Sequence, residues 1–516
     1  MSKVYLTTPL YYVNAHPHIG HAYTNVIADC MARFYRSKGD AVYFLTGTDE
    51  HGEKIKEAAG KENKEVKEFV EEKVKNFTHL WKELNISYDF FIRTTFSFHE
   101  EVVKKVIIHL FNKGDIYKEK YKGFYCVPCE SFWTESQVKE TGGCPECGRK
   151  VKEIEEENYF FRLSKYEDWL KEHLKNHSQF IRPKIRYNEV VGFLENNPLV
   201  DLCISRPRKR VEWGIDFPLD KNYVVYVWFE ALLNYISGAG FYFEEERFKN
   251  LWPANIHFIG KDILRQHAII WPIILKSLEI EPPNLVFAHG WWKVEDVKMS
   301  KSKGNIVNPL ELISALESYN LKKESAIDVL RYFLLREIPV GSDGNFSWYA
   351  VITRANNDLA NDLGNLVYRT LNMMEKYMDA KVSSLSREMP LEFKEIFLSL
   401  DKNYISLMEK GGFSLCLEEI FKFINIMNKY IEDKKPWIFY KERSYEELKN
   451  FLYSLLEGIR ITSLYLYPFI PYTASYILAQ LGVKKEEISL RKKRWAANEG
   501  YLISKEKPLF PRIDVD

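Results

Sequence analysis

Short apolar runs alternate with amphipathic segments in the first third of the chain. Residues 4–7 and 41–45 are apolar runs of strand length, and apolar residues recur at helical spacing over 26–34, before a stop at Gly39. A strand, a helix and a second strand joined by short turns predict a parallel sheet in an α/β domain. Ligands of such sheets bind just beyond the carboxyl ends of the strands.

The same alternation stops near residue 115 and resumes near Phe217. Strands are predicted around 223–228, 256–259 and 286–289, and a helix at 262–278 separates the last two. The stretch between the two parts is rich in Glu and Lys and contains a tight group of four cysteines. We therefore predict an insertion between two halves of one nucleotide-binding domain.

From about residue 308 the pattern changes to long amphipathic helices. The main ones are predicted at 348–378, 391–409, 414–433 and 445–481, and together they predict an all-α bundle. The predicted parts of the chain are 1–115 and 216–295 for the α/β domain, 116–215 for the insertion, 296–347 for a connecting region, 348–490 for the bundle and 491–516 for a tail.

Composition narrows the class of protein without deciding it. Lys and Arg total 73 and Asp and Glu total 72, so the formal net charge is +1. A protein that holds nucleic acid by charge alone is usually far more basic, so an RNA partner would need local patches, stacking and shape. The N-terminus does not resemble a secretory signal, and no window approaches about 18 apolar residues. These features predict a cytoplasmic protein with no membrane partner.

Four of the seven cysteines form two Cys-x2-Cys pairs separated by 14 residues, namely Cys126 with Cys129 and Cys144 with Cys147. Two such pairs can present four thiolates as a tetrahedron, which is the arrangement that structural zinc requires. Four protein ligands leave no open coordination position. We therefore predict one structural Zn²⁺ that takes no part in chemistry, with free thiols as the alternative.

His18-Ile19-Gly20-His21 lies at a predicted strand-to-helix turn. Imidazoles three residues apart lie side by side on the first turn of a helix. The backbone N–H groups and the helix dipole there favour anions. Gly20 leaves room for a phosphorylated ligand to approach the backbone. The arrangement suits a nucleoside triphosphate, although by itself it could be a loop that happens to contain histidines.

A lysine-rich loop at 298–304 follows the last predicted strand, 280 residues after His18. Flexible lysines such as Lys298 and Lys301 suit the β- and γ-phosphates and a departing pyrophosphate. Alone, such a segment is more often a solvated basic turn. Its coincidence with the histidine motif in the same α/β unit favours the functional interpretation.

These two motifs resemble the paired HIGH and KMSKS signatures of class I aminoacyl-tRNA synthetases, and the wider sequence resembles the methionyl-tRNA synthetase family. The resemblance implies a Rossmann-like parallel-sheet catalytic domain with a zinc-binding insertion, a KMSKS-loop and stem-contact region, and an α-helical anticodon-binding domain. It runs from about residue 3 to the C-terminus, and the further segments that carry it are 7–14, 47–52, 226–232, 257–262 and 287–290.

The resemblance implies roles for residues of the α/β domain. A thioether packs well against aromatic ring edges, so an aromatic-walled slot suits methionine. Taken singly, the aromatic residues could be core packing and the 260–262 turn a helix cap. The implied catalytic residues are His18, His21, Lys298 and Lys301. The implied ATP ligands are His18, Gly20, His21, Gly260, Asp262 and Lys301. The implied methionine ligands are Leu10, Tyr12, Asp49 (for the ammonium), Trp228, Ala231, Tyr235, Ile263 and His267.

One predicted bundle helix carries Asn361, Asn365 and Arg369 at i, i+4 and i+8, with an apolar stripe on the opposite side. Asn and Arg side chains can read base edges, and Pro436-Trp437 offers a stacking platform. Without the resemblance, this is a solvated polar face. With it, the five residues are implied to bind the CAU anticodon.

The implied reaction forms methionyl-adenylate from L-methionine and ATP with Mg²⁺, and then transfers the methionyl group to the 3′-terminal adenosine of tRNA(Met). It needs no protein nucleophile, so catalysis would be positioning and electrostatic stabilisation. Because the insertion leaves little room for an editing domain, we expect misactivated homocysteine to be cleared in the synthetic site. Some family members carry an added C-terminal tRNA-binding domain, so a separate tRNA-binding subunit is one possible partner.

The alternatives are another class I synthetase, a small nucleotidyltransferase and a non-catalytic RNA-binding protein. Synthetases for leucine, isoleucine or valine usually carry a large editing insertion, and one for cysteine would need an open zinc position. A nucleotidyltransferase would need neither the bundle nor the cysteine pairs. A non-catalytic relative would have lost the phosphate-binding motifs, and both are intact here.

Overall fold

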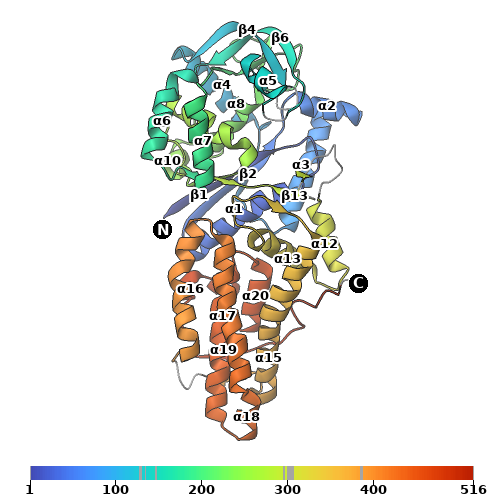
Figure 1. The fold of residues 1–516 in the computed structure, drawn as a ribbon, viewed down its shortest axis with the longest axis vertical. Helices are drawn as coiled ribbons and strands as arrows, with labels where there is room; N and C mark the ends of the chain where they lie inside the picture. Colours follow the sequence, from blue (N-terminus) through green and yellow to red (C-terminus); the bar gives the residue numbers. More distant parts are fainter. Residues whose placement is uncertain are drawn as a thin grey trace.

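Three parts of the chain follow one another along the long axis of the molecule (Figure 1). The insertion lies at one end, the α/β domain in the middle and the helical bundle at the other end. This computed structural model describes residues 2–126, 131–133, 135–145, 148–294, 297–298, 307–383 and 388–514.

The α/β domain is built on a six-stranded sheet in which all neighbouring strands are parallel. The strand order is β3-β2-β1-β11-β12-β7. β1 therefore pairs with β2 on one side and with β11, from far along the chain, on the other. The bounds are β1 Lys3–Tyr12, β2 Ala41–Asp49, β3 Phe90–Arg93, β7 Ile181–Arg182, β11 Ile256–Gly260 and β12 Val286–His289.

Four predicted strands, at 4–7, 41–45, 256–259 and 286–289, are confirmed, and the first two extend further than predicted. The fifth, at 223–228, is only partly right. β10 (Tyr223–Val225) ends early, pairs antiparallel with β9 (Ser205–Pro207) and lies outside the main sheet. Helix α8 (Val227–Leu232) takes the remaining residues. Residues 223–227 of this apolar run are all buried, so the sequence had no periodicity to distinguish strand from helix.

The insertion contains a four-stranded antiparallel sheet in the order β5-β4-β6-β8. Helices α6 (Glu167–Asn176) and α7 (Lys184–Asn196) follow this sheet. Between those helices, β7 leaves the insertion and pairs with β12 at the edge of the main sheet. The bounds of the four strands are β4 Ile116–Cys126, β5 Ser131–Trp133, β6 Lys152–Phe161 and β8 Leu202–Cys203.

Long helices build the bundle below the α/β domain (Figure 1). The helices predicted at 348–378, 391–409 and 414–433 are confirmed, although the first includes a π-helical segment, η5 (Ala355–Gly364). The prediction of a single helix over 445–481 is wrong. This segment forms two helices, α19 (Tyr445–Leu466) and α20 (Pro471–Gln480), because Pro468 and Pro471 cannot donate the backbone hydrogen bonds that a continuous helix needs. The remaining bundle helices are α13 Lys323–Arg336, α14 Trp348–Arg354, α15 Asn365–Met378, α16 Leu391–Glu409, α17 Phe413–Lys434 and α18 Pro436–Lys441.

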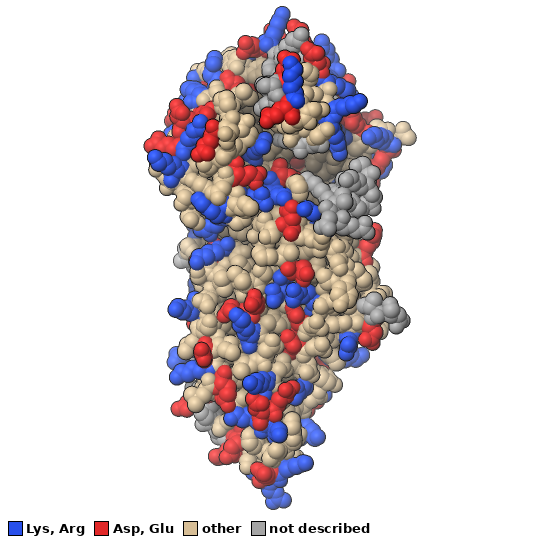
Figure 2. Space-filling model, viewed as in Figure 1, with Lys and Arg blue, Asp and Glu red and all other residues tan. Residues whose placement is uncertain are grey.

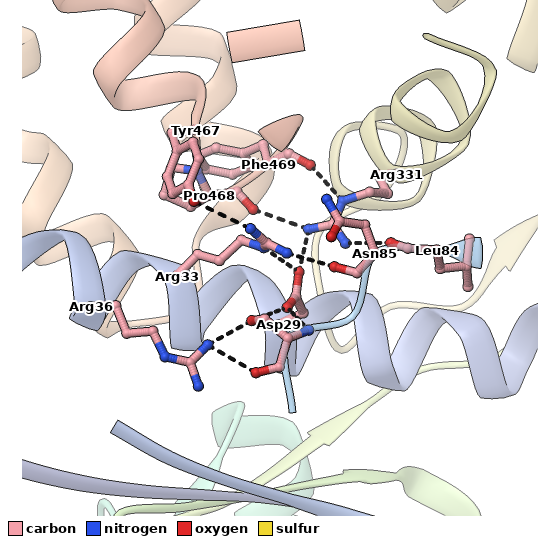
Figure 3. A network of polar contacts seen from close by, with 10 residues as sticks. Asp29, Arg33, Arg36, Leu84, Asn85, Arg331, Tyr467, Pro468 and Phe469 are labelled. Carbon is pink, nitrogen blue, oxygen red and sulfur yellow. Dashed lines mark hydrogen bonds and ion pairs between the residues drawn. The ribbon is translucent and has the colours of Figure 1, made fainter. Parts of the chain in front are cut away.

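Helix α1 (Ile19–Lys38) connects β1 to β2 and lies between the sheet and the bundle (Figure 1). Its C-terminal end is at Gly39, which adopts a φ of 87° and donates a hydrogen bond to Arg36. One continuous apolar core runs from α1 through α13 into the bundle. Figure 3 shows a polar network within this interface, in which Asp29 meets Arg33 and Arg331.

Basic and acidic side chains are interspersed over the face drawn in Figure 2, as the near-zero net charge leads one to expect. No helix in the described part of the chain combines the length and apolar character required to cross a membrane.

Candidate active site

A cavity of about 410 Å³ opens at the carboxyl edge of the main sheet. The last residue of each of four parallel strands lines it, namely Tyr12 of β1, Asp49 of β2, Gly260 of β11 and His289 of β12. The cavity therefore lies where the strand pattern predicts a ligand site. Its volume falls in the range of small-molecule and cofactor sites.

The histidine motif forms the first turn of α1. His18 is the N-cap residue, and its Nδ1 accepts a hydrogen bond from the Gly20 amide at 3.1 Å. Nδ1 of His21 accepts one from the His18 amide at 3.2 Å. The two rings stack with centroids 3.8 Å apart. Because both Nδ1 atoms accept, each neutral ring carries its hydrogen on Nε2, which leaves two N–H donors at the helix N-terminus.

The packing of the His18 ring explains why position 20 is a glycine. A Cβ atom at this position would lie 2.9 Å from Cε1 of His18, so a side chain here would displace the stacked ring. Burial holds the pKa of His21 well below its usual value, and His18 lowers it further. His21 is therefore an uncharged hydrogen-bond donor in this structure.

Tyr235 and His267 form a buried hydrogen-bonded pair at one end of the cavity. The Tyr235 hydroxyl lies 2.7 Å from Nε2 of His267, and Nδ1 of His267 lies 2.9 Å from the carbonyl oxygen of Ile263. The carbonyl can only accept, so Nδ1 carries the hydrogen and Nε2 accepts from Tyr235. Burial lowers the pKa of His267 to about 4, which keeps the ring neutral. Trp228 and Ala231 of α8 line the same cavity.

Asp49 is 9% exposed at the end of β2, in register with Tyr12 on β1. The turn that follows Asp49 is fixed to α8 by His51, whose Nδ1 lies 2.8 Å from Glu230 Oε1. Burial lowers the pKa of His51, but the Glu230 carboxylate outweighs this, so the net shift is upward. This buried, hydrogen-bonded pair thus holds the Asp49 turn against the helix that carries Trp228.

The turn after β11 places Gly260 and Asp262 on the opposite flank of the cavity. A Cβ on Gly260 would lie 2.5 Å from Oδ1 of Asp262, so any side chain here would displace the Asp262 carboxylate. The same Oδ1 accepts a hydrogen bond from Nε1 of Trp291 at 3.1 Å.

Several residues that line this cavity have no role predicted from the sequence. Thr24 Oγ1 lies 2.7 Å from Nε2 of His289, which ties the histidine helix to the end of β12. His289, Trp291 and Lys54 also line the cavity. His289 lies in a segment that carries the family resemblance, whereas nothing in the local sequence pattern points to Thr24 or Lys54.

Three predicted sites involve residues outside the described part of the chain. Lys301 lies outside it, as does the side chain of Lys298, whose backbone pairs with Lys293 between β14 (Val297–Lys298) and β13 (Trp292–Val294). Cys129 and Cys147 also lie outside the described residues. Cys126, at the end of β4, and Cys144 are described, and both are buried.

The polar stripe of the bundle faces outward as predicted. Asn361 and Asn365 are exposed, Arg369 is half-buried, and the apolar stripe opposite them is buried. Arg369 lies 3.8 Å from Glu432 of α17. α17 ends shortly before Pro436 and Trp437, of which Trp437 is 41% exposed. The stripe therefore belongs to η5 and α15, and Trp437 belongs to α18 at the end of the bundle (Figure 1).

Comparison with known proteins decides the family. The family model described as tRNA synthetases class I (M) matches residues 4–153 and 149–371. The model described as the anticodon-binding domain of tRNA ligase matches 397–510. A methionine–tRNA ligase of Caldanaerobacter subterraneus subsp. tengcongensis is 45% identical over 99% of this chain and 79% of the relative. The chain belongs to the methionyl-tRNA synthetases.

Other similarities agree with this assignment. The methionine–tRNA ligase of Thermotoga maritima is 42% identical over 99% of this chain and 80% of its own length. The structure of Mycobacterium tuberculosis methionyl-tRNA synthetase in complex with methionyl-adenylate matches with a TM-score of 0.93 and 39% identity. That match covers 99% of this chain and 100% of the other. The enzyme is thus a methionine–tRNA ligase, and the alternatives left open by the sequence are excluded.

Proposed function

We propose that the cavity at the carboxyl edge of the sheet binds methionine and ATP together and forms methionyl-adenylate there. One observation carries the proposal. All described residues predicted to bind methionine or ATP, from five separate segments of the chain, line one cavity. The M. tuberculosis relative was solved with methionyl-adenylate, which supports the same ligand for this chain.

In the proposed first step, a carboxylate oxygen of methionine attacks the α-phosphorus, and the bond from that phosphorus to the bridging oxygen of pyrophosphate breaks. His18 and His21 donate from Nε2 to phosphate oxygens at the positive end of α1. Neutral donors suit this task because they are already oriented by their backbone contacts and need no change of protonation. The ammonium groups of Lys298 and Lys301 would stabilise the negative charge that develops on pyrophosphate as it leaves. Mg²⁺ would enter with ATP.

Methionine would lie in the slot between β1, α8 and the His267 helix. Its ammonium would bind Asp49, a partly desolvated carboxylate. Its thioether would meet the aromatic walls of Trp228 and Tyr235, and Leu10, Tyr12, Ala231 and Ile263 would complete the slot. His267 holds the Tyr235 hydroxyl away from the sulfur, so the slot presents ring surface and not an unpaired donor. On the other flank, Asp262, oriented by Trp291, would bind ribose hydroxyls beside Gly260.

We also propose that the cysteine pairs hold one structural zinc ion. The donor set fits: Cys126 ends one strand of a hairpin, and the Gly148 amide donates to the Cys144 carbonyl oxygen at 2.8 Å in a tight turn. Such turns present two thiolates from adjacent positions. The bound ion would supply folding energy to the insertion and no chemistry.

The bundle residues Asn361, Asn365, Arg369, Pro436 and Trp437 are proposed to bind the anticodon. Residues 397–510, which include Pro436 and Trp437, match an anticodon-binding family model, and this match supports the role of those two residues. We retain the predicted division of the chain, with a catalytic domain, its insertion, a stem-contact region and the anticodon domain, as part of the proposal.

The direct test is amino-acid-dependent ATP–pyrophosphate exchange, run with each of the twenty amino acids and without tRNA. Exchange with methionine, and its loss in Asp49→Asn, is the expected result. Exchange that survives Asp49→Asn with an unchanged KM for methionine would contradict the proposed placement of the ammonium.

A further inference from the structure

The active-site cavity holds an unusual balance of charge for a site that receives anions. Among the described residues that line it, Lys54 is the only lysine or arginine. Two carboxylates, Asp49 and Asp262, line it as well. Burial lowers the pKa of three lining histidines, so they add no positive charge near neutral pH: His21, His267 and His289. Among the described residues that line the cavity, Lys54 therefore supplies the cationic side chain.

Lys54 lies on the methionine flank of the cavity. It belongs to the first turn of α2 (Glu53–Lys61), which begins directly after the turn that follows Asp49. Its Nζ lies 5.4 Å from the centroid of the Tyr12 ring, in cation–π contact. Tyr12 is in strand register with Asp49. Lys54 and Asp49 thus flank the same aromatic side chain, and the nucleotide-side residues Gly260 and Asp262 come from the end of β11.

The other lysine in the first turn of α2 differs in its partner. Lys56 forms an ion pair with Glu212 on the exposed surface. Lys54, by contrast, makes no ion pair with any carboxylate in the described portion of the chain; the Tyr12 ring is its partner there. A ring attracts a cation without neutralising it, so the ammonium of Lys54 keeps its capacity to bind an anion.

We propose that Lys54 binds the carboxylate of methionine before it reacts, which rests on the proposed placement of methionine in this cavity. The ammonium and carboxylate of an amino acid are attached to one carbon, so the groups that bind them must lie close together. Asp49 and Lys54 meet this requirement as a pair of opposite charge on one flank. Lys54 also offsets the repulsion that Asp49 and Asp262 would exert on an incoming carboxylate.

The experiment compares two ligands that differ only at the carboxylate. Methioninol has a CH₂OH group in its place and keeps the ammonium and thioether. We would measure the affinities of both for the enzyme, its Lys54→Gln and Lys54→Arg variants, and the matched control Lys56→Gln. Lys54→Gln should weaken methionine binding about tenfold, the scale of one charge-assisted hydrogen bond, and leave methioninol binding unchanged. Lys54→Arg should retain most of the affinity for methionine, and Lys56→Gln should change neither ligand.

Equal weakening of both ligands by Lys54→Gln would overturn the proposal, because it would mean that Lys54 only shapes the pocket. Unchanged methionine affinity with slower single-turnover transfer to tRNA would also overturn it, in favour of a contact to the tRNA end. Asp49→Asn and Tyr235→Phe separate this inference from the proposed function. If those variants bind methionine normally, methionine lies elsewhere and both assignments fail. If they lose it while Lys54→Gln does not, only the assignment of Lys54 fails.

Discussion

Arg331 donates a hydrogen bond to Asp29 at 2.7 Å, and both side chains are fully buried (Figure 3). Arg331 also donates to the carbonyl oxygens of Phe469 at 3.0 Å and Leu84 at 3.1 Å. Asp29 belongs to α1, the helix that begins at the two histidines of the cavity, and Phe469 lies between α19 and α20 of the bundle. One guanidinium therefore joins the helix that begins at the cavity to the helical bundle.

Replacing Arg331 by alanine should strongly destabilise the enzyme. It removes one of the two arginines that pair with buried Asp29 and leaves the carbonyl oxygens of Leu84 and Phe469 without this donor. Removal of one partner of a buried ion pair costs about 3–5 kcal/mol. The control is Lys323→Ala at the start of the same helix, where the exposed pair with Glu83 should contribute less than about 1 kcal/mol. The free energies of unfolding of both variants are measured by denaturant titration. Equal losses in the two variants would contradict a special role for Arg331.

The stability of the enzyme should depend on pH through Asp29. Burial raises the pKa of this carboxyl, but Arg33 and Arg331 lower it more, from 3.8 to about 2. A depressed folded-state pKa gives stability that is present above about pH 4 and is lost as the pH falls towards 2. The difference in unfolding free energy between wild type and Asp29→Asn should shrink by about 2 kcal/mol over that window.

Asp328 should give the opposite dependence of stability on pH, because its pKa is raised and that of Asp29 is lowered. Burial raises the pKa of this α13 carboxyl to about 6. The stability that it contributes is present below its unfolded pKa near 4 and is lost as the pH rises through 6. A pH series on Asp328→Asn that moves in the same direction as the series on Asp29→Asn would contradict one of the two assignments.

Tyr235→Phe should raise the KM for methionine about tenfold or more and leave the KM for ATP unchanged. The substitution leaves Nε2 of buried His267 without its donor, which costs about 1–3 kcal/mol. Tyr404→Phe is the control, because it removes a buried hydroxyl that donates to the carbonyl oxygen of Tyr465 at 2.9 Å in the bundle. That variant should lose stability without any change in either KM, as measured by pyrophosphate exchange.

Removal of zinc should unfold the insertion. Elemental analysis should find one zinc ion per chain, and Cys144→Ser should lose it, because the ion would supply the folding free energy of the cysteine turns. Cys203→Ser, at a buried cysteine on β8, should keep the metal. Full zinc content in Cys144→Ser would rule out the proposed site.

Trp437→Ala should lower kcat/KM for aminoacylation by roughly 10–100-fold while leaving pyrophosphate exchange unchanged. Stacking of one base on an aromatic side chain is worth about 1–3 kcal/mol, and the first reaction step needs no anticodon. Leu391→Ala is the control, since Leu391 is 83% exposed at the start of α16. An equal loss in the exchange reaction would show instead that Trp437 supports the fold.

Much of this architecture could be predicted from the sequence. The local sequence pattern agrees with the observed structure at several elements, namely the strands at 256–259 and 286–289, the helix at 391–409 and the histidine turn of α1. Prediction failed where the local pattern was ambiguous. The apolar run at 223–228 lacks periodicity because its first five residues are all buried. The apolar pattern at 445–481 continues through Pro468 and Pro471, which end the first helix and begin the second.

The sequence by itself determined the family, the parallel sheet, the bundle and the residues of the two motifs, because these depend on periodicity and on short ordered strings. Only the tertiary structure decided that Lys54 enters the cavity, that Thr24 meets His289 and that Arg331 reaches Asp29. Such pairs are brought together by strand order and helix packing. Contacts between residues hundreds of positions apart leave no local pattern, so they cannot be predicted from one amino-acid sequence.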